Sequence, residues 1–175
     1  NTFLSSYIPT SYGPATRGGD IAYLDGTAGT EFDDIYRSDE GTFIIDWFNN
    51  PDGNHNDGYV FTVDDGTGNN RIAAVNSNNY QVTVTSGGSS QGTRDLGSIN
   101  SGANKISLAY KLNDQATSLN GSDVSVDTSC TLPTGVNYMW FGLRQGQYDF
   151  LGGYISRIVY YTKRLPNNQL KTLSS

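Results

Sequence analysis

The sequence is poor in charge, in glutamate and in cysteine, and each shortage excludes a class of protein. Charged residues make up 16% of the 175 residues, and only 2 of the 17 acidic residues are Glu. Glu favours helix surfaces whereas Asp favours turns and caps, so a helical bundle is excluded. The single cysteine, Cys130, allows neither an internal disulfide nor a cysteine-based zinc site. No apolar run approaches the ~18 residues of a membrane-spanning helix, which predicts no membrane insertion.

The chain is rich instead in glycine, small polar residues and aromatics. It contains 21 Gly and 17 Asn, together with 12 Tyr, 7 Phe and 2 Trp. Disordered chains of this polarity usually lack aromatics, so the combination predicts short β-strands joined by polar turns. The net charge is −6 and the 11 Lys and Arg residues are scattered. Because phosphate binding needs clustered basic residues, we predict no nucleic-acid partner.

Hydrophobic patterns predict nine or ten strands and one helix. Residues 80–85 and 105–112 alternate between apolar and polar side chains, as in an antiparallel sheet with one face toward water. Residues 42–48 (TFIIDWF) are apolar on both faces, as in a strand covered on both sides. Further strands are predicted at residues 59–64, 71–76, 138–144 and 154–161. The only predicted helix is at residues 166–173, so the fold class is all-β, a two-sheet antiparallel β-sandwich with one short C-terminal helix.

Three stretches, in the same order along the chain, resemble parts of one family. They are residues 5–20 (SSYIPTSYGPATRGGD), 104–121 (NKISLAYKLNDQATSLNG) and 152–175 (GGYISRIVYYTKRLPNNQLKTLSS). These stretches resemble the opening, a central hairpin and the end of the concanavalin A-like, laminin-G-like jelly-roll domains common in bacteriophage structural proteins. The resemblance spans most of the chain.

The resemblance implies a single jelly-roll domain over residues 1–175, at the C-terminal end of a longer virion protein such as a tail fibre, spike or head decoration. It implies a location on the virion surface and a non-catalytic, adhesive role that recognises host-surface polysaccharide. The alternative is a structural domain that assembles with other virion subunits, or with copies of itself, without binding sugar. Neither function requires a cofactor.

The sequence lacks the acidic residues that sugar hydrolysis requires. A retaining glycoside hydrolase uses two carboxylates about 5 Å apart. Asp46 is the only acid in its predicted strand, and the only glutamates, Glu31 and Glu40, fall in a stretch with the pattern of a loop. No Ser-His-Asp or metal-hydrolase spacing surrounds the single histidine, His55. We therefore predict that the protein is not an enzyme.

One loop has the composition of a calcium site. In DGNHNDG, at residues 52–58, oxygen-bearing side chains recur as they do in calcium loops. The candidate ligands are Asp52, Asn54, Asn56 and Asp57, with Asp64 and Asp65 available in the following turn. Against calcium, Asp57 stands where such a loop has glycine, and Val63 stands where it has a bidentate Glu. A plain polar turn is the alternative.

A second candidate site follows from aromatic and polar residues near the C-terminal strands. Sugars need an aromatic surface beside hydrogen-bonding side chains. Alternation in residues 138–144 puts Met139 and Phe141 on one face and Trp140 and Arg144 on the other, so Trp140 and Arg144 point outward if the first face is core. The predicted glycan-binding residues are Trp140, Arg144, Gln147, Tyr148 and Asp149, with Asn54 and His55 from the other rim. The alternative is that Trp140 lies in the core, as we expect for Trp47.

Overall fold

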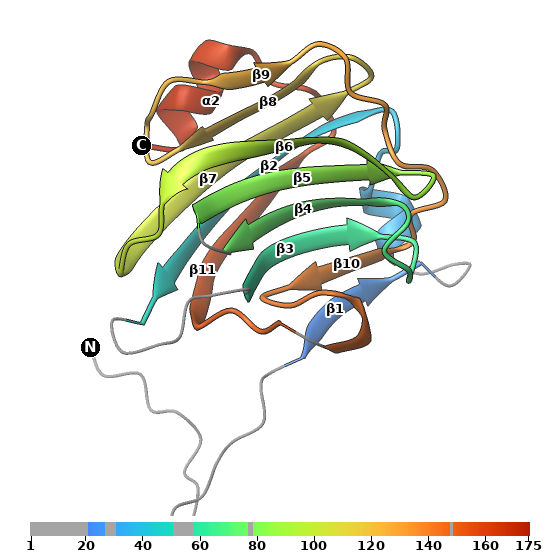
Figure 1. Cartoon of the computed structure of the whole chain (residues 1–175), viewed down its shortest axis with the longest axis horizontal. Helices are drawn as coiled ribbons and strands as arrows, with labels where there is room; N and C mark the ends of the chain where they lie inside the picture. Colours follow the sequence, from blue (N-terminus) through green and yellow to red (C-terminus); the bar gives the residue numbers. More distant parts are fainter. Residues whose placement is uncertain (1–20, 27–30, 51–57, 77–78, 148) are drawn as a thin grey trace, which may run out of the picture.

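The computed structural model describes residues 21–26, 31–50, 58–76, 79–147 and 149–175, which form two antiparallel sheets packed face to face (Figure 1). The six-stranded sheet has the order β1 (Ala22–Asp25), β10 (Tyr138–Phe141), β3 (Gly58–Asp64), β4 (Arg71–Asn76), β5 (Asn79–Ser86) and β6 (Ser89–Ser98). The five-stranded sheet has the order β11 (Gly153–Tyr161), β2 (Glu40–Asn49), β7 (Gly102–Lys111), β8 (Gln115–Leu119) and β9 (Ser125–Asp127). The helices are α1 (Glu31–Ile35), the 3₁₀ turn η1 (Gln145–Gln147) and α2 (Asn167–Leu173). The predicted all-β, two-sheet sandwich is confirmed.

Most strands lie where the pattern predicts them, but the strand predicted at residues 138–144 ends at Phe141, because Gly142 has a left-handed backbone (φ 75). β5 buries Tyr80, Val82 and Val84, and α2 begins one residue after the predicted start. β6 (SSQGTRDLGS) was not predicted because it has almost no apolar residues; it is an edge strand that is held by pairing with β5. The loop expected at Glu31 and Glu40 was wrong. Glu31 begins the short helix α1, and Glu40 pairs with Lys111 and extends β2 beyond its apolar run.

Apolar side chains from both sheets fill the space between them. Those of the five-stranded sheet are chiefly Phe43, Ile45, Trp47, Ile106, Leu108 and Tyr110, and those of the six-stranded sheet are chiefly Phe61, Val63, Ile72, Tyr80, Val82 and Val84. Trp47 is therefore a core residue, as expected, and its indole N–H donates to Asn49 Oδ1 at 3.1 Å. Because alternate residues of a strand point to opposite sides, the remaining side chains form two outer faces.

Helix α2 covers part of the outer face of the five-stranded sheet. Leu170 is fully buried against Ala109 of β7 and Ala116 of β8. The hydroxyl of Ser107 donates to the carbonyl oxygen of Leu170 at 2.9 Å, which fixes the helix on the sheet. Within the described part of the chain, no helix is long and apolar enough to cross a membrane.

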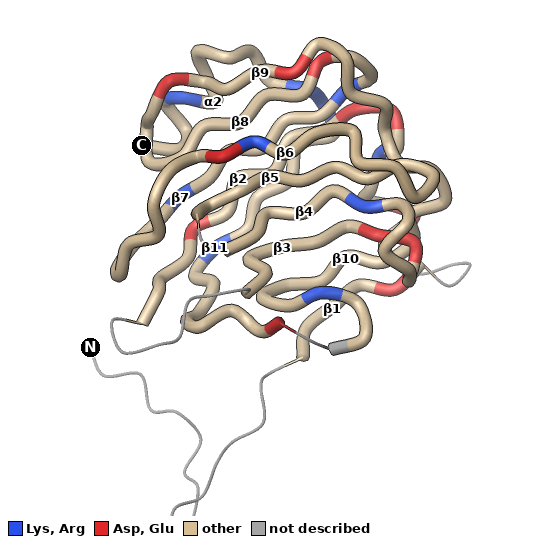
Figure 2. Tube along the Cα trace, viewed as in Figure 1, with Lys and Arg blue, Asp and Glu red and all other residues tan. Residues whose placement is uncertain are grey.

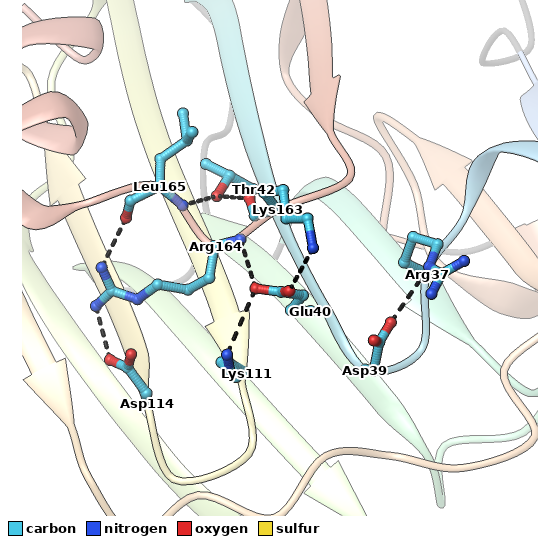
Figure 3. A network of polar contacts seen from close by, with 9 residues as sticks. All are labelled: Arg37, Asp39, Glu40, Thr42, Lys111, Asp114, Lys163, Arg164 and Leu165. Carbon is cyan, nitrogen blue, oxygen red and sulfur yellow. Dashed lines mark hydrogen bonds and ion pairs between the residues drawn. The ribbon is translucent and has the colours of Figure 1, made fainter.

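A group of ion pairs, here called the Glu40 network, fastens the segment before α2 to β2 and β7 (Figure 3). Lys163 Nζ donates to Glu40 Oε1 at 3.1 Å, and the backbone N–H of Arg164 donates to Glu40 Oε2 at 3.2 Å. Lys111 Nζ lies 3.7 Å from Oε2, and the Arg164 guanidinium donates to Asp114 Oδ1 at 2.7 Å. The hydrogen bonds from the Arg164 backbone and from Lys163 lower the pKa of Glu40. The network is thus a stabilising contact between the sheet and the C-terminal segment.

Candidate functional site

A straight row of side chains crosses the outer face of the six-stranded sheet. It begins on the edge strand β1 and continues over the next four strands. In the strand register, Trp140 of β10 pairs with Tyr23 of β1 and with Thr62 of β3. Thr62 pairs with Ala73 of β4, which pairs with Thr83 of β5. We call Tyr23, Trp140, Thr62, Ala73 and Thr83 the central row. Because neighbouring strands lie about 4.8 Å apart, the row runs perpendicular to the strands across most of the sheet.

A hollow of about 470 Å³ opens on this face beside the central row. We call it the arginine hollow. Its lining residues are Tyr59, Arg71, Val75, Gln81, Thr83, Arg144 and Asp149. They come from β3, β4, β5 and the segment after β10, and Figure 2 shows basic positions on β4 and in that segment. Pairing of strands distant in sequence therefore brings the two arginines to one place.

Both arginines of the hollow lie over the ring of Tyr59. The guanidinium carbon of Arg144 is 5.8 Å from the ring centroid, and that of Arg71 is 6.0 Å away. Arg71 Nη1 also donates to the Tyr59 hydroxyl at 3.5 Å. Cation–π attraction holds a guanidinium near an aromatic face without neutralising its charge.

One carboxylate, Asp149, lines the hollow with these two guanidinium groups. Arg144 Nε donates to Asp149 Oδ2. The backbone of Asp149 is left-handed (φ 54), a conformation that Asp tolerates better than most residues. Its carbonyl oxygen accepts the N–H of Tyr59 at 2.9 Å, which ties the segment after β10 to β3. Among the described residues that line the hollow, two positive groups thus face one negative group, so this lining favours an anion.

Several polar atoms on this face have no hydrogen-bond partner among the described residues. They are Thr62 Oγ1, Asp64 Oδ2, Arg71 Nε and Thr83 Oγ1, all buried. Buried polar atoms normally have hydrogen-bond partners. These four atoms therefore keep hydrogen-bonding capacity that no contact among the described residues uses. Two of these residues, Arg71 and Thr83, line the hollow, and Thr62 and Asp64 lie on the neighbouring strand β3.

Trp140 has the predicted orientation but not the predicted exposure. Met139 and Phe141 contact the core, so Trp140 points outward, as expected. Yet it is only 7% exposed, because Tyr23 stacks on it with the ring centroids 4.8 Å apart and Tyr138 stacks at 5.5 Å. The expectation that its indole lies open on the sheet was therefore wrong. The alternation of residues predicted the side of the strand to which Trp140 points, but it could not show which side chains cover Trp140.

A buried carboxylate fixes Trp140 in place. The indole N–H donates to Asp64 Oδ1 at 3.1 Å, and the same oxygen accepts the backbone N–H of Gly66 at 2.9 Å. Asp64 is fully buried, and burial raises the pKa of its carboxyl group, although these two hydrogen bonds act against the rise. Asp64 therefore holds the aromatic stack from the neighbouring strand β3.

The structure brings together only part of the predicted glycan-binding set. Arg144 and Asp149 meet in the arginine hollow, whereas Trp140 lies in the central row beside it. Gln147 lies in η1. The remaining predicted residues, Tyr148, Asn54 and His55, lie outside the described residues.

The predicted calcium ligands Asp52, Asn54, Asn56 and Asp57 also lie outside the described residues. Of the two carboxylates in the next turn, Asp64 is bonded to Trp140 and Gly66, and Asp65 accepts hydrogen bonds from Thr67 and Asn70. Within the parts of the chain that the structure describes, no three His, Cys, Asp or Glu side chains form a group that could hold a metal ion. Calcium binding at residues 52–57 stays a prediction.

Sequence reasoning missed Tyr59, Arg71, Gln81 and Thr83. The available signal was the alternation in RIAAVN, which places Arg71, Ala73 and Val75 on the face opposite Ile72 and Ala74. That pattern gave an arginine on an outer face. It gave no indication that Arg144, more than 70 residues later, would lie beside the same tyrosine.

Two other hollows lie at the five-stranded sheet. In the first, of about 520 Å³, the charged side chains have hydrogen-bond partners: Arg157 Nε donates to Asp46 Oδ2 at 3.0 Å and Lys105 Nζ to the backbone oxygen of Ser175 at 2.6 Å. The second, of about 330 Å³, lies between Tyr161 and α2 and has an uncharged lining. Among the hollows of the described residues, the arginine hollow is therefore the candidate for binding a charged ligand.

Comparison with known proteins supports the fold. No family model and no curated protein sequence matches the chain. The CBM40 module of the Ruminococcus gnavus IT-sialidase, solved with α2,6-sialyllactose, is similar in structure: the TM-score is 0.69 and the identity 17%, over 89% of this chain and 93% of the module. Domain 4 of the Geobacillus stearothermophilus arabinanase AbnA, in complex with arabinotriose, has a TM-score of 0.62 and 16% identity, over 90% of this chain and 82% of that domain.

The leech intramolecular trans-sialidase is also similar, with a TM-score of 0.65 and 21% identity over 89% of this chain, but the chain matches only 26% of that enzyme. At these identities the likeness establishes a shared β-sandwich. None of the three is a phage protein, so the phage part of the sequence resemblance has no structural counterpart among them.

Proposed function

We propose that the protein is a non-catalytic carbohydrate-binding module whose arginine hollow holds the carboxylate of an acidic sugar, such as a terminal sialic acid. The observation that carries the proposal is the convergence of Arg71 and Arg144 on Tyr59, with Asp149 the one carboxylate among the described residues that line the hollow. Asp64, the register partner of Arg71, does not line the hollow and accepts hydrogen bonds from Trp140 and Gly66. A guanidinium group matches a carboxylate in a two-bond geometry that few other side chains offer.

The rest of the lining suits a sugar ring. The Tyr59 ring can pack against the apolar C–H face of a sugar, and Gln81 and Thr83 offer an amide and a hydroxyl for its hydroxyl groups. Only one carboxylate, Asp149, lines the hollow among the described residues. Because hydrolysis by the usual retaining or inverting mechanism needs two, this supports binding without catalysis.

The structural neighbours support the same class of ligand. The R. gnavus module was solved with sialyllactose, an acidic glycan, and the arabinanase domain with arabinotriose, a neutral one. The sandwich therefore suits both kinds of sugar. In this chain the two arginines favour the acidic kind.

The finer hypothesis, attachment of a phage virion to host-surface glycans, rests on the sequence resemblance alone. A shallow hollow gives weak binding for one copy, but many copies on one particle would act together. The alternative, assembly without sugar binding, needs an apolar patch around an exposed Trp140, and Tyr23 and Tyr138 cover that residue. We therefore favour the glycan.

Titration calorimetry with α2,6-sialyllactose and with lactose tests the proposal. Lactose lacks the carboxylate, so we expect it to bind at least tenfold more weakly. Arg71→Gln should weaken sialyllactose binding by about tenfold or more, because a charged hydrogen bond contributes about 1.5–3 kcal/mol. The control Lys111→Gln removes one positive charge from the Glu40 network and should leave the affinity unchanged. Equal binding of both sugars, or no effect of Arg71→Gln, would contradict the proposal.

A further inference from the structure

Tyr23 lies on the same sheet face as the arginine hollow and in line with it. Both Tyr23 and the hollow residue Thr83 belong to the central row, with Trp140, Thr62 and Ala73 between them. Tyr23 is 46% exposed, although it packs on Trp140. An outward tyrosine ring is thus available beside the hollow.

The ring of Tyr23 is held by the aromatic rings beside it on the same face. Tyr23 and Trp140 are stacked at 26° between ring planes, and Trp140 is in turn stacked on Tyr138. The hydrogen bond from Trp140 to the buried Asp64 fixes the indole. A binding surface whose support is already ordered loses little conformational freedom when a ligand arrives.

Distance places Tyr23 outside the reach of the sugar that occupies the hollow. β1 lies three strand spacings from β4, which is about 14 Å, and β10 lies two spacings away, about 10 Å. A single sugar ring bound beside Arg71 and Tyr59 cannot also cover Tyr23. A chain of two or three sugars that runs along the central row can.

The charges near Tyr23 differ from those of the hollow. Asp25 lies on the same face of β1, two residues from Tyr23. Its carboxylate disfavours a second carboxylate at this position, whereas an aromatic ring favours the C–H face of a neutral sugar.

We infer that Tyr23, supported by Trp140, is the platform of a second subsite, which holds a neutral sugar of the same glycan whose acidic residue occupies the arginine hollow. The inference rests on the proposed function. It gives the glycan a direction, with its acidic end over β4 and its neutral part over β10 and β1. It also assigns to Tyr23 the contact that the sequence pattern suggested for Trp140.

The test compares a single acidic sugar with an extended one. Wild-type protein should bind α2,6-sialyllactose several-fold more tightly than free N-acetylneuraminic acid. Tyr23→Ala should lower the affinity for sialyllactose by about three- to tenfold and leave that for the free sugar unchanged. Tyr23→Phe keeps the ring and should behave as wild type. The matched control is Tyr154→Ala, which removes a tyrosine of similar exposure (47%) from the other sheet and should change neither affinity.

A second measurement needs no variant. In saturation-transfer NMR on the wild-type protein, the galactose and glucose protons of sialyllactose should receive magnetisation as well as those of the sialic acid. Transfer to the sialic acid alone, or full retention of the sialyllactose affinity in Tyr23→Ala, would overturn the subsite and leave the hollow intact. If the wild type bound neither sugar, the proposed function itself would fail, and the subsite with it.

Discussion

In the Glu40 network, donors from Lys111, Lys163 and Arg164 converge on one carboxylate, whereas in the arginine hollow two guanidinium groups converge on an aromatic ring. The first arrangement satisfies the hydrogen-bonding capacity of one carboxylate and joins two segments far apart in sequence, and its lysine side chains are exposed to solvent. The second leaves positive charge directed at an open hollow. Clusters of the same residue types can therefore serve stability in one place and binding in another, and the partner that they face decides which.

The largest effect should come from Asp64, the buried carboxylate that accepts the indole N–H of Trp140. Asp64→Ala leaves the N–H groups of Trp140 and Gly66 without their acceptor. We expect the free energy of unfolding, measured by urea denaturation, to fall by about 1–3 kcal/mol. A loss below 0.5 kcal/mol would contradict a supporting role.

The control Asp64→Asn keeps an acceptor oxygen and removes the charge. Because burial raises the pKa of Asp64, its ionised form disfavours the folded state, and this penalty is relieved as the pH falls through the folded-state pKa toward 3.8. The asparagine variant, which carries no charge, should therefore be at least as stable as wild type at pH 7. Its free energy of unfolding should also lack the increase that protonation of Asp64 gives the wild type as the pH falls.

Glu40→Gln, in the Glu40 network, should lower the stability of the protein without changing its affinity for sialyllactose. The lowered pKa of Glu40 means that its contribution is present above about pH 4.5 and is lost as the pH falls through the folded-state pKa. The variant should melt at a lower temperature than wild type at pH 7, with a difference that shrinks below pH 4. Its affinity for sialyllactose should be unchanged, and a weakened affinity would mean that the two clusters are coupled.

The smallest effect should come from Asp149→Asn in the hollow. Asparagine can still accept a hydrogen bond from Arg144, but it no longer offsets the arginine charges. Exposed ion pairs contribute about 0.2–1 kcal/mol, so calorimetry should show sialyllactose binding tightened by up to about fivefold. Unchanged or weaker binding would indicate that Asp149 contacts the sugar itself.

The fold was predictable from the sequence because the main strands are marked by alternation of apolar and polar residues that are close in sequence. Tyr80, Val82 and Val84 alternate with polar residues, so both the strand and its buried face follow from the order of residues. Strand β6 has no such pattern, and only its pairing with β5 makes it a strand.

The candidate site was predictable only in part because it depends on which strands become neighbours. Arg144 and Asp149 are close in sequence and were found together. Arg71 and Tyr59 lie on one hairpin, and only the placement of β10 beside β3 brings Arg144 to them. Likewise, nothing in the residues around Trp140 shows that Tyr23, from the other end of the chain, covers it.

The position of α2 also determines how the protein can be displayed. The helix packs on β7 and β8 on the outer face of the five-stranded sheet, and Ser175 lies there against Lys105. A linker attached to that residue leaves from the side of the sandwich away from the arginine hollow. Copies coupled to a bead or sensor through the C-terminus would thus all present the hollow toward the solution. On such a surface, the overall affinity for a multivalent glycan should rise with the density of copies, although each single contact is weak.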